Sequence, residues 1–295
     1  MTPLEVDVLS ARGGLSRIRK TGSPGGWAFD TAALDAHVRA RGAFQEGHVV
    51  VLTVMKGGDA AINGVPLQDG TMLMLPDGAE ITASIRSEVL YSASVLPVDT
   101  WRAIVGIATG EETEGVDRGH ALRQKPEDLA RTSGSLAYAI DWLDRQPVLE
   151  SVMPGPYLDY LGTVAAIIAG PDQIDRHLSR SVRQRQRQAW LAEELIRARL
   201  HEQLSITDIC RETRISRRQL EYAFQTTFGV GPAEYLRVLR LNESRRLLKL
   251  GRAAQSSVTE IALGVGVTHL GRFAQHYRYL FGETPQQTLR GGHRT

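Results

Sequence analysis

The chain has 295 residues, of which 42% are hydrophobic, and a formal net charge of +2. That length predicts two domains, each long enough to bury a core. The sequence has no signal-peptide pattern and no apolar run near eighteen residues, so we expect a soluble cytoplasmic protein with no membrane partner. A single cysteine, Cys210, excludes an internal disulfide framework and a cysteine-rich zinc site.

The charge is unevenly distributed along the chain. Residues 187–295 hold 17 Lys and Arg against 10 Asp and Glu, whereas residues 1–186 hold 18 against 23. A basic tail joined to a mildly acidic head is typical of a nucleic-acid-binding domain attached to a domain of another kind. A basic solvated surface without a partner would give the same counts, so charge alone leaves both interpretations open.

The first 26 residues are rich in Gly, Ser and Arg and show little periodicity, which predicts a loose arm. A basic cluster lies within it, formed by Arg12, Arg17, Arg19 and Lys20. A disordered basic arm is the simplest interpretation. The alternatives are that the cluster holds an anionic ligand or touches the other domain or DNA.

Short β-prone runs separated by Gly, Asp and Asn follow. They cover residues 48–54, 60–62, 65–67, 71–76, 80–85 and 89–96. Asn63-Gly64 between two of these runs is a strong signal for a two-residue hairpin, because both residue types accept a positive φ. Several short strands within fifty residues predict a small sandwich or barrel.

One motif in this region resembles the second motif of the cupin barrels. It runs from Gly70 to Pro76-Asp77-Gly78. A metal-binding cupin would place a histidine where this chain has Ile81, and the nearby His37 and His48 do not form a His-x-His pair. A zinc or iron site needs several converging ligands. We therefore expect a cupin-like barrel without a metal and without a cofactor.

Helical periodicity begins after about residue 120. One apolar stripe comprises Leu129, Leu136, Ile140 and Leu143, and a second comprises Leu158, Leu161, Ala165 and Ile168. Each stripe lies on one helical face, so we expect a pair of helices that ends before Gly170-Pro171. The stripes exceed what the pair could bury against itself and a small barrel, which predicts a homodimer. Residues 171–186 are polar and basic and are interpreted as a linker.

The tail is helical from residue 189 onward and contains a helix-turn-helix pattern. Ser205 and Asp208 have the spacing of a capping box, and so do Ser216 and Gln219. Two short helices with a tight turn follow from these caps. Their shared core is expected to comprise Ile206, Ile209, Ile215, Leu220 and Phe224. Polar side chains on the first turns of the second helix suit reading of the DNA major groove.

The pattern then repeats. Ser257 and Glu260 form a third capping box, Thr268 is expected to cap the last helix of the pair, and Phe281-Gly282 repeats Phe228-Gly229 after 53 residues. The expected core is Ile261, Ala262, Val267, Phe273 and Tyr277. One long helix over residues 233–250, stopped by Gly251, would separate the two units as a stiff spacer.

These matched positions identify residues 189–291 as similar to the AraC/XylS-type regulators, and the ending from His269 to Arg290 resembles the ethanolamine-operon regulator branch. The resemblance implies two recognition helices in successive major grooves. It carries the DNA-binding role onto Arg217, Arg218, Glu221, Tyr222, Gln225, His269, Leu270, Gly271, Arg272, Gln275 and Arg278. Gly271 departs from the pattern because it presents no side chain, so the second helix would read fewer bases.

We therefore predict an α+β protein. Its expected parts are an arm and cupin-like sensor barrel over 1–118, a helical dimerisation hairpin over 119–170, the linker over 171–186 and a DNA-binding domain over 187–295. The predicted function is a transcription regulator, not an enzyme, that binds double-stranded DNA and a small organic effector, with an amine as first candidate and RNA polymerase as a further partner. The alternatives are a cupin-type enzyme with an accessory DNA-binding tail and an architectural DNA-binding protein without a ligand.

Overall fold

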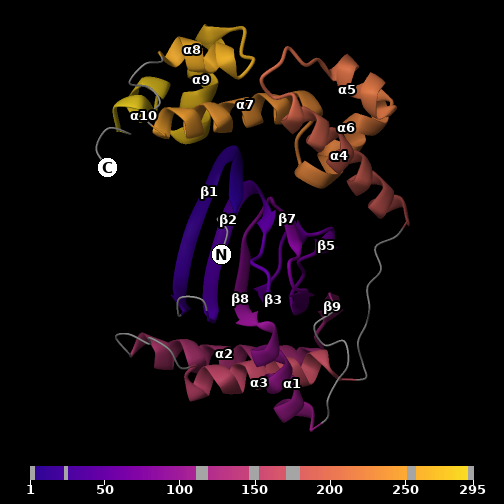
Figure 1. Ribbon diagram of the computed structural model, residues 1–295, viewed down its shortest axis with the longest axis vertical. Coiled ribbons are helices and arrows are strands. Elements are labelled where there is room, and N and C mark those ends of the chain that lie inside the picture. The colour runs from indigo at the N-terminus through magenta and orange to yellow at the C-terminus, as the bar shows by residue number, and fades with distance from the viewer. Residues whose placement is uncertain are drawn as a thin grey trace. The chain divides into compact units, whose positions relative to one another are not determined.

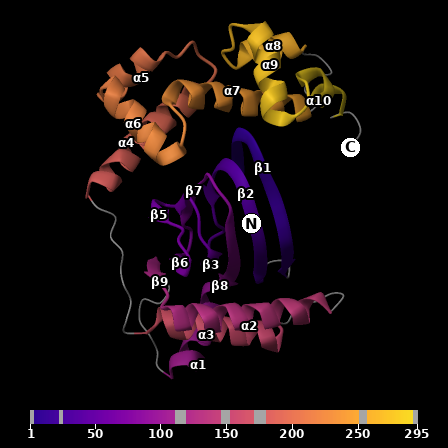
Figure 2. The same cartoon turned by 180° about the vertical axis from the view of Figure 1, so that it is seen from behind.

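The computed structural model describes residues 4–22, 26–110, 119–145, 153–170, 180–250 and 257–291. The chain divides into two compact units. The sheet unit comprises residues 1–5, 14–36 and 41–177, and the helical unit comprises residues 6–13, 37–40 and 178–295. Figures 1 and 2 show the strands of the first and the helices of the second from opposite sides. Among the described residues, no helix is long and apolar enough to cross a membrane.

Within the described residues, the strands form a nine-stranded sheet that curls strongly (Figure 1). The strand order is β5-β4-β7-β2-β8-β3-β6-β9, with β1 paired to β2. Antiparallel pairing joins β2 to β8, β3 to β8, β3 to β6 and β6 to β9. The strands are β1 (Glu5–Gly22), β2 (Ala28–Ala43), β3 (His48–Lys56), β4 (Ala60–Ile62), β5 (Val65–Pro66), β6 (Thr71–Leu75), β7 (Glu80–Ile85), β8 (Val89–Pro97) and β9 (His120–Arg123).

The six β-prone runs of the sequence are confirmed as β3 to β8, and the turns between them explain their register. Asn63 and Gly64 adopt φ values of 47° and 82°, and they close the β4–β5 hairpin in which Ile62 pairs with Val65. Between β6 and β7, the Asp77 carboxylate accepts a hydrogen bond from the Gly47 backbone amide at 2.5 Å. The cupin-like motif therefore forms a turn that is tied to the start of β3.

The predicted loose arm is wrong for residues 5–22, which form strand β1. The side chains of Arg12, Arg17, Arg19 and Lys20 lie outside the described part of the structure. Strand β2 was not predicted either. Its sequence is rich in Ala, Asp and Arg, residues with low β propensity, so pairing with β8 rather than local preference makes it a strand.

Helices α1 (Val98–Thr109), α2 (Pro126–Asp144) and α3 (Gly155–Ile168) belong to the sheet unit. Their apolar faces share a core with one face of the sheet, where Phe29, Val51 and Met74 are buried. Most residues of the two predicted stripes are buried or half-buried in this core, including Leu136 at 3% exposure. The premise that the stripes exceed what the pair can bury against itself and a small barrel is therefore wrong for these residues, because they pack into one core with the sheet.

The helical unit contains α4 (Arg180–Ala198), α5 (Ile206–Thr213), α6 (Arg217–Phe228), α7 (Pro232–Lys249), α8 (Val258–Gly264), α9 (Leu270–Phe281) and α10 (Pro285–Gly291). The end of the predicted linker is thus helical, while residues 171–179 and Gly251 lie outside the described residues. Two segments from early in the chain, 6–13 of β1 and 37–40 of β2, complete this unit. Leu9 is 2% exposed and belongs to its hydrophobic core.

Candidate nucleic-acid interface

Two helix pairs of similar construction lie at either end of helix α7. In the first, the Ser205 hydroxyl accepts from the Asp208 amide and the Asp208 carboxylate accepts from the Ser205 amide, which caps α5. Ser216 and Gln219 cap α6 in the same way. Both predicted capping boxes are confirmed. Between the helices Arg214 adopts φ 56°, the left-handed conformation that a tight turn needs.

The second pair differs from the first at the start of its second helix. Ser257 and Glu260 cap α8 as predicted, and Gly266 with φ +77° makes the turn. The predicted cap by Thr268 is wrong: His269 is the capping position of α9, and no side chain satisfies the helix amides there. The free amides at this N-terminus leave hydrogen-bond donors and a partial positive charge exposed, an arrangement that suits a phosphate.

All the predicted DNA-binding positions are on the surface. On α6 these exposed residues are Arg217, Arg218, Glu221, Tyr222 and Gln225, and on or next to α9 they are His269, Leu270, Gly271, Arg272, Gln275 and Arg278. The opposite faces of the two helices are buried, with Leu220 and Phe224 on α6 and Phe273 and Tyr277 on α9. Each helix is therefore anchored by an apolar face and presents a polar face outward.

Three of the α6 residues already have neighbours in the free protein. The Tyr222 ring lies 5.2 Å from the guanidinium carbon of Arg185, a residue that sequence reasoning did not select. The Gln225 amide donates to the Gly229 carbonyl at 3.2 Å. A Cβ on Gly231 would lie 2.3 Å from Oε1 of Glu221, so the glycine leaves room for that carboxylate. These contacts restrict the side chains that would face a base pair.

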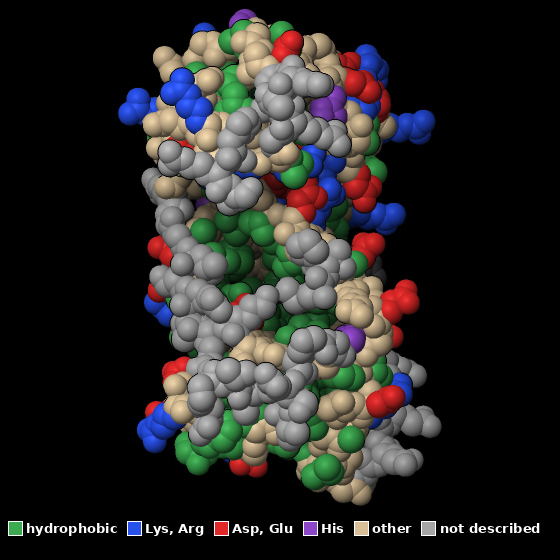
Figure 3. All heavy atoms as spheres, turned by 60° about the vertical axis from the view of Figure 1, so that its left-hand side comes forward, with side chains coloured by type: hydrophobic (Ala, Val, Ile, Leu, Met, Phe, Trp, Pro, Cys, Tyr) green, Lys and Arg blue, Asp and Glu red, His purple; other side chains and the backbone are tan. Residues whose placement is uncertain are grey.

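Helix α9 presents less side-chain surface at its start. A Cβ added at Gly271 would meet no atom within 4 Å, so the missing side chain leaves open space beside Arg272. Burial lowers the pKa of His276 from 6.5, and the charges of Arg237 and Arg272 act in the same direction. The charge of Glu234 acts in the opposite direction but does not reverse the shift, so His276 is mostly neutral at pH 7. Lys and Arg side chains project from several points of the helical unit, which forms the upper part of Figure 3.

The described strands of the sheet unit have a largely apolar interior. Ile81, at the position where a metal cupin would hold histidine, is 7% exposed. The part of the chain that the structure describes contains no group of three or more His, Cys, Asp or Glu that could hold a metal ion. Where α3 packs on the sheet, the hydroxyl of Ser92 on β8 lies 2.7 Å from the hydroxyl of Tyr160 on α3. Burial raises the pKa of Tyr160, so its hydroxyl stays protonated and able to donate.

The geometry defines the helical unit as a tandem helix-turn-helix protein module of the kind that binds DNA. Residues 209–291 match the family model described as "Helix-turn-helix domain". The chain is 38% identical over 97 residues to the XylDLEGF operon transcriptional activator of Pseudomonas putida, covering 33% of this chain and 30% of that one. It is 33% identical over 93 residues to the regulator ArgR of Pseudomonas aeruginosa, covering 32% and 27%.

A solved structure is also similar, that of a transcriptional regulator with an AraC-type DNA-binding domain from Chromobacterium violaceum. The identity is 32%, the coverage 38% of this chain and 97% of that chain, and the TM-score 0.35. The chain spans about 30% of the length of the first curated relatives that it matches. The C-terminal part of the chain therefore carries a helix-turn-helix domain of the AraC/XylS type, which confirms the resemblance drawn from the sequence. The narrower ethanolamine-operon likeness is not confirmed.

Proposed function

We propose that the protein is a sequence-specific, double-stranded-DNA-binding transcription regulator that carries out no catalysis and acts in the cytoplasm, where its DNA lies. The observation that carries this proposal is the pair of helices α6 and α9, each anchored by a buried apolar face and presenting an exposed polar face. Helix α7, with 18 residues, separates them. At 1.5 Å per residue it is about 27 Å long, somewhat shorter than one turn of B-DNA at roughly 34 Å, and the two helices lie beyond its ends.

In this proposal Arg217, Arg218, Glu221, Tyr222 and Gln225 read or position the DNA through α6. On the α9 side, His269, Leu270, Arg272, Gln275 and Arg278 do so, while Gly271 contributes only backbone. Arginine can pair with both acceptors of a guanine, and glutamine with an adenine. The gap at Gly271 favours α6 as the main base reader and α9 as a helix that also relies on phosphate contacts.

Footprinting on operator DNA tests this function. Two helices one DNA turn apart should protect two major-groove segments about 10 bp apart on one face of the duplex. Affinity should fall steeply with salt, because Lys and Arg displace counterions from phosphates. Protection of one site of about 5 bp, or no preference for any sequence, would contradict the proposal.

We further propose that a small organic molecule controls DNA binding from the sheet unit, with an amine as the first candidate. The apolar strand faces support a mostly apolar site with few polar anchors. A homodimer would form through the helices of the sheet unit, where Tyr138 of α2 is 58% exposed and Leu158 of α3 is 39% exposed. RNA polymerase is the proposed protein partner at a promoter. Sedimentation tests the homodimer, and a thermal-shift screen of small amines tests the effector.

A further inference from the structure

Segments from the start of the chain are built into the helical unit. Leu9 of β1 is buried in its core together with residues of α4, α6 and α7. The Asn242 side chain on α7 holds the backbone of Val8 from both sides, accepting from its amide at 3.0 Å and donating to its carbonyl at 2.9 Å. This pairing ties the path of β1 to helix α7 independently of the Val8 side chain.

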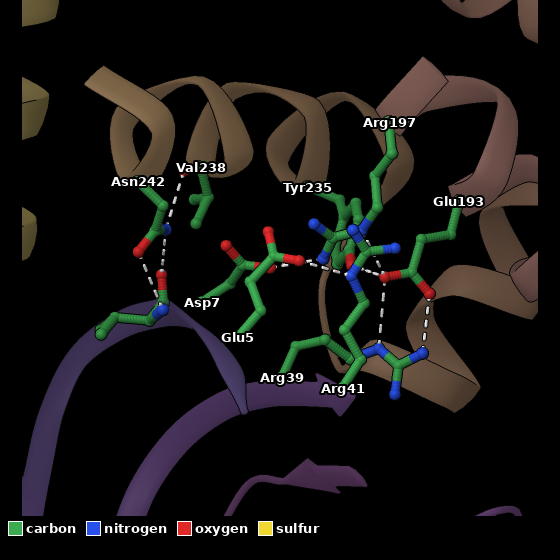
Figure 4. A network of polar contacts seen from close by, with 10 residues as sticks. Glu5, Asp7, Arg39, Arg41, Glu193, Arg197, Tyr235, Val238 and Asn242 are labelled. Atoms are coloured by element: carbon green, nitrogen blue, oxygen red, sulfur yellow. Dashed lines mark hydrogen bonds and ion pairs between the residues drawn. The ribbon is translucent and has the colours of Figure 1, made fainter. Parts of the chain in front are cut away.

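A buried network of charges joins the same strands to the helices (Figure 4). Arg39 of β2 donates from Nη2 to Oε2 of Glu193 on α4 at 2.7 Å. The other oxygen of Glu193 accepts from Arg197 Nε at 3.0 Å and from the Tyr235 hydroxyl at 2.6 Å. Arg197 also pairs with Asp7 of β1. Two guanidinium groups and two carboxylates thus balance one another, with each side chain at most one-tenth exposed.

Two residues of β2 reach the end of recognition helix α6. His37 Nε2 lies 2.7 Å from the carbonyl oxygen of Phe228, the last residue of α6. The carbonyls of a final helical turn have no partner within the helix, so an N–H donor there satisfies one of them. The Arg39 guanidinium carbon lies 5.2 Å from the centre of the Phe228 ring, whose other contacts include the Tyr235 ring at a centroid distance of 4.6 Å.

We propose that His37 and Arg39 are positioning residues for DNA binding: they hold the C-terminal end of α6 and thereby set the angle at which its exposed face meets the major groove. The proposal rests on the proposed DNA-binding function. A reading helix must be placed to within a fraction of an ångström to pair with base edges, and its supporting contacts provide that precision. Strand β2 therefore contributes to operator recognition without touching DNA.

The test compares Arg39→Gln and His37→Ala with Arg41→Gln in the full chain. Arg41 is the matched control because it lies on the same strand and pairs with Glu5 at 2.8 Å, with both side chains at least 40% exposed. The half-site that α6 occupies is first assigned as the one whose bases respond to Arg218→Ala. In footprinting, Arg39→Gln and His37→Ala should lose protection there and retain it over the α9 half-site.

The operator Kd should rise at least about tenfold for Arg39→Gln, because a buried ion pair is broken. It should change by less than about twofold for Arg41→Gln, whose ion pair is exposed. Hydrogen exchange of the free proteins gives a second readout: amides at the end of α6 should exchange faster in Arg39→Gln and His37→Ala than in the control. If Arg39→Gln does not fold, His37→Ala, which removes one contact of a half-buried residue, decides the matter.

Equal weakening of both half-sites, or variants that match Arg41→Gln in binding and exchange, would overturn the positioning role. A wild-type protein with no preference for any DNA sequence would instead overturn the proposed function. In that case the exchange measurement still shows whether β2 holds the end of α6, so the two failures are distinguishable.

Discussion

Arg39 and Glu193, 154 positions apart in the sequence, form a two-point ion pair in which both side chains are almost completely buried. Burial acts to raise the pKa of Glu193, but the charges of Arg39 and Arg197 and the hydrogen bonds from Arg39 and Tyr235 outweigh it, so its pKa lies below the usual 4.5. The carboxylate is therefore more acidic in the folded chain than in the unfolded one.

A depressed carboxylate pKa predicts acid sensitivity of the helical unit. The stabilisation by ionised Glu193 is complete above its unfolded pKa of about 4.5 and is lost as the pH falls through its lower folded pKa. The free energy of unfolding, measured by urea denaturation, should therefore fall with pH below about 4.5. Glu193→Gln should show a shallower dependence, whereas Glu234→Gln, at an exposed ion pair, should follow the wild type. Parallel curves for all three proteins would contradict this assignment.

The second prediction concerns Leu9. Its side chain is 2% exposed in the core of the helical unit, so Leu9→Ala should lower the free energy of unfolding by about 2–5 kcal/mol through lost burial and a residual cavity. Val6 on the same strand is 52% exposed, and Val6→Ala should change stability by no more than about 0.5 kcal/mol. Chemical denaturation of both variants measures the difference. A similar small effect for both would show that β1 does not contribute to this core.

The third prediction separates base reading from phosphate contact. Arg218→Ala should weaken operator binding by about 1–3 kcal/mol and random DNA much less, if the guanidinium pairs with guanine. Arg211 on α5 is exposed and already paired with Asp208 at 2.6 Å, so Arg211→Ala is the control. Equal losses on operator and random DNA would make Arg218 a phosphate contact.

Two glycines at the ends of α9 allow a prediction about stability. Gly271 lies in the first turn of α9, and its position can accept a Cβ without a clash. Gly271→Ala should therefore raise the free energy of unfolding by about 0.4–1 kcal/mol, because alanine has less backbone entropy to lose. Gly282→Ala is the control: its φ of +72° disfavours any side chain, so this variant should be destabilised. Thermal unfolding compares them. A destabilised Gly271→Ala would show that the surface at the start of α9 is less open than described.

The fifth prediction distinguishes a core residue of α2 from a residue at the proposed dimer interface. Leu136 is 3% exposed, so Leu136→Glu should unfold the sheet unit rather than only dissociate a dimer. Tyr138→Glu, at a position 58% exposed, should leave the fold intact and shift the proposed dimer toward monomer. Circular dichroism and sedimentation velocity measure the two effects. A folded Leu136→Glu protein, or an unchanged sedimentation coefficient for Tyr138→Glu, would contradict this division.

The sequence predicted those helices and turns that are stabilised by contacts between residues close together in the chain. The capping serines 205, 216 and 257 marked the starts of α5, α6 and α8, because the hydrogen bonds lie within four residues. Asn63-Gly64 similarly predicted its hairpin. By contrast, β1, β2, α1, β9 and α10 were missed. The charged, alanine-rich sequence of β2 forms a strand because it pairs with β8. The two strands are far apart in the sequence, so no local pattern predicts their pairing.

The candidate DNA-binding positions could be selected from the sequence because each lies opposite a recognisable apolar stripe. The residues that pack against these positions could not be selected in this way. Arg185 contacts Tyr222 because α4 packs against α6. Arg39 contacts Glu193 because β2 passes beside α4. A charged residue in a sequence looks solvent-exposed by default, and only its partner reveals burial.

The discontinuous composition of the helical unit has a consequence for biosynthesis. Asp7, Leu9 and Arg39 are synthesised about 140 to 170 residues before the start of α4, which at typical rates of 5–20 residues per second amounts to roughly 7 to 35 seconds. Until α4 and α7 have been synthesised, an apolar side chain and two charges have no burial site in this unit. The unit therefore reaches its native core only late in translation, and a nascent chain that stalls before α4 would leave Leu9 open to chaperones and aggregation.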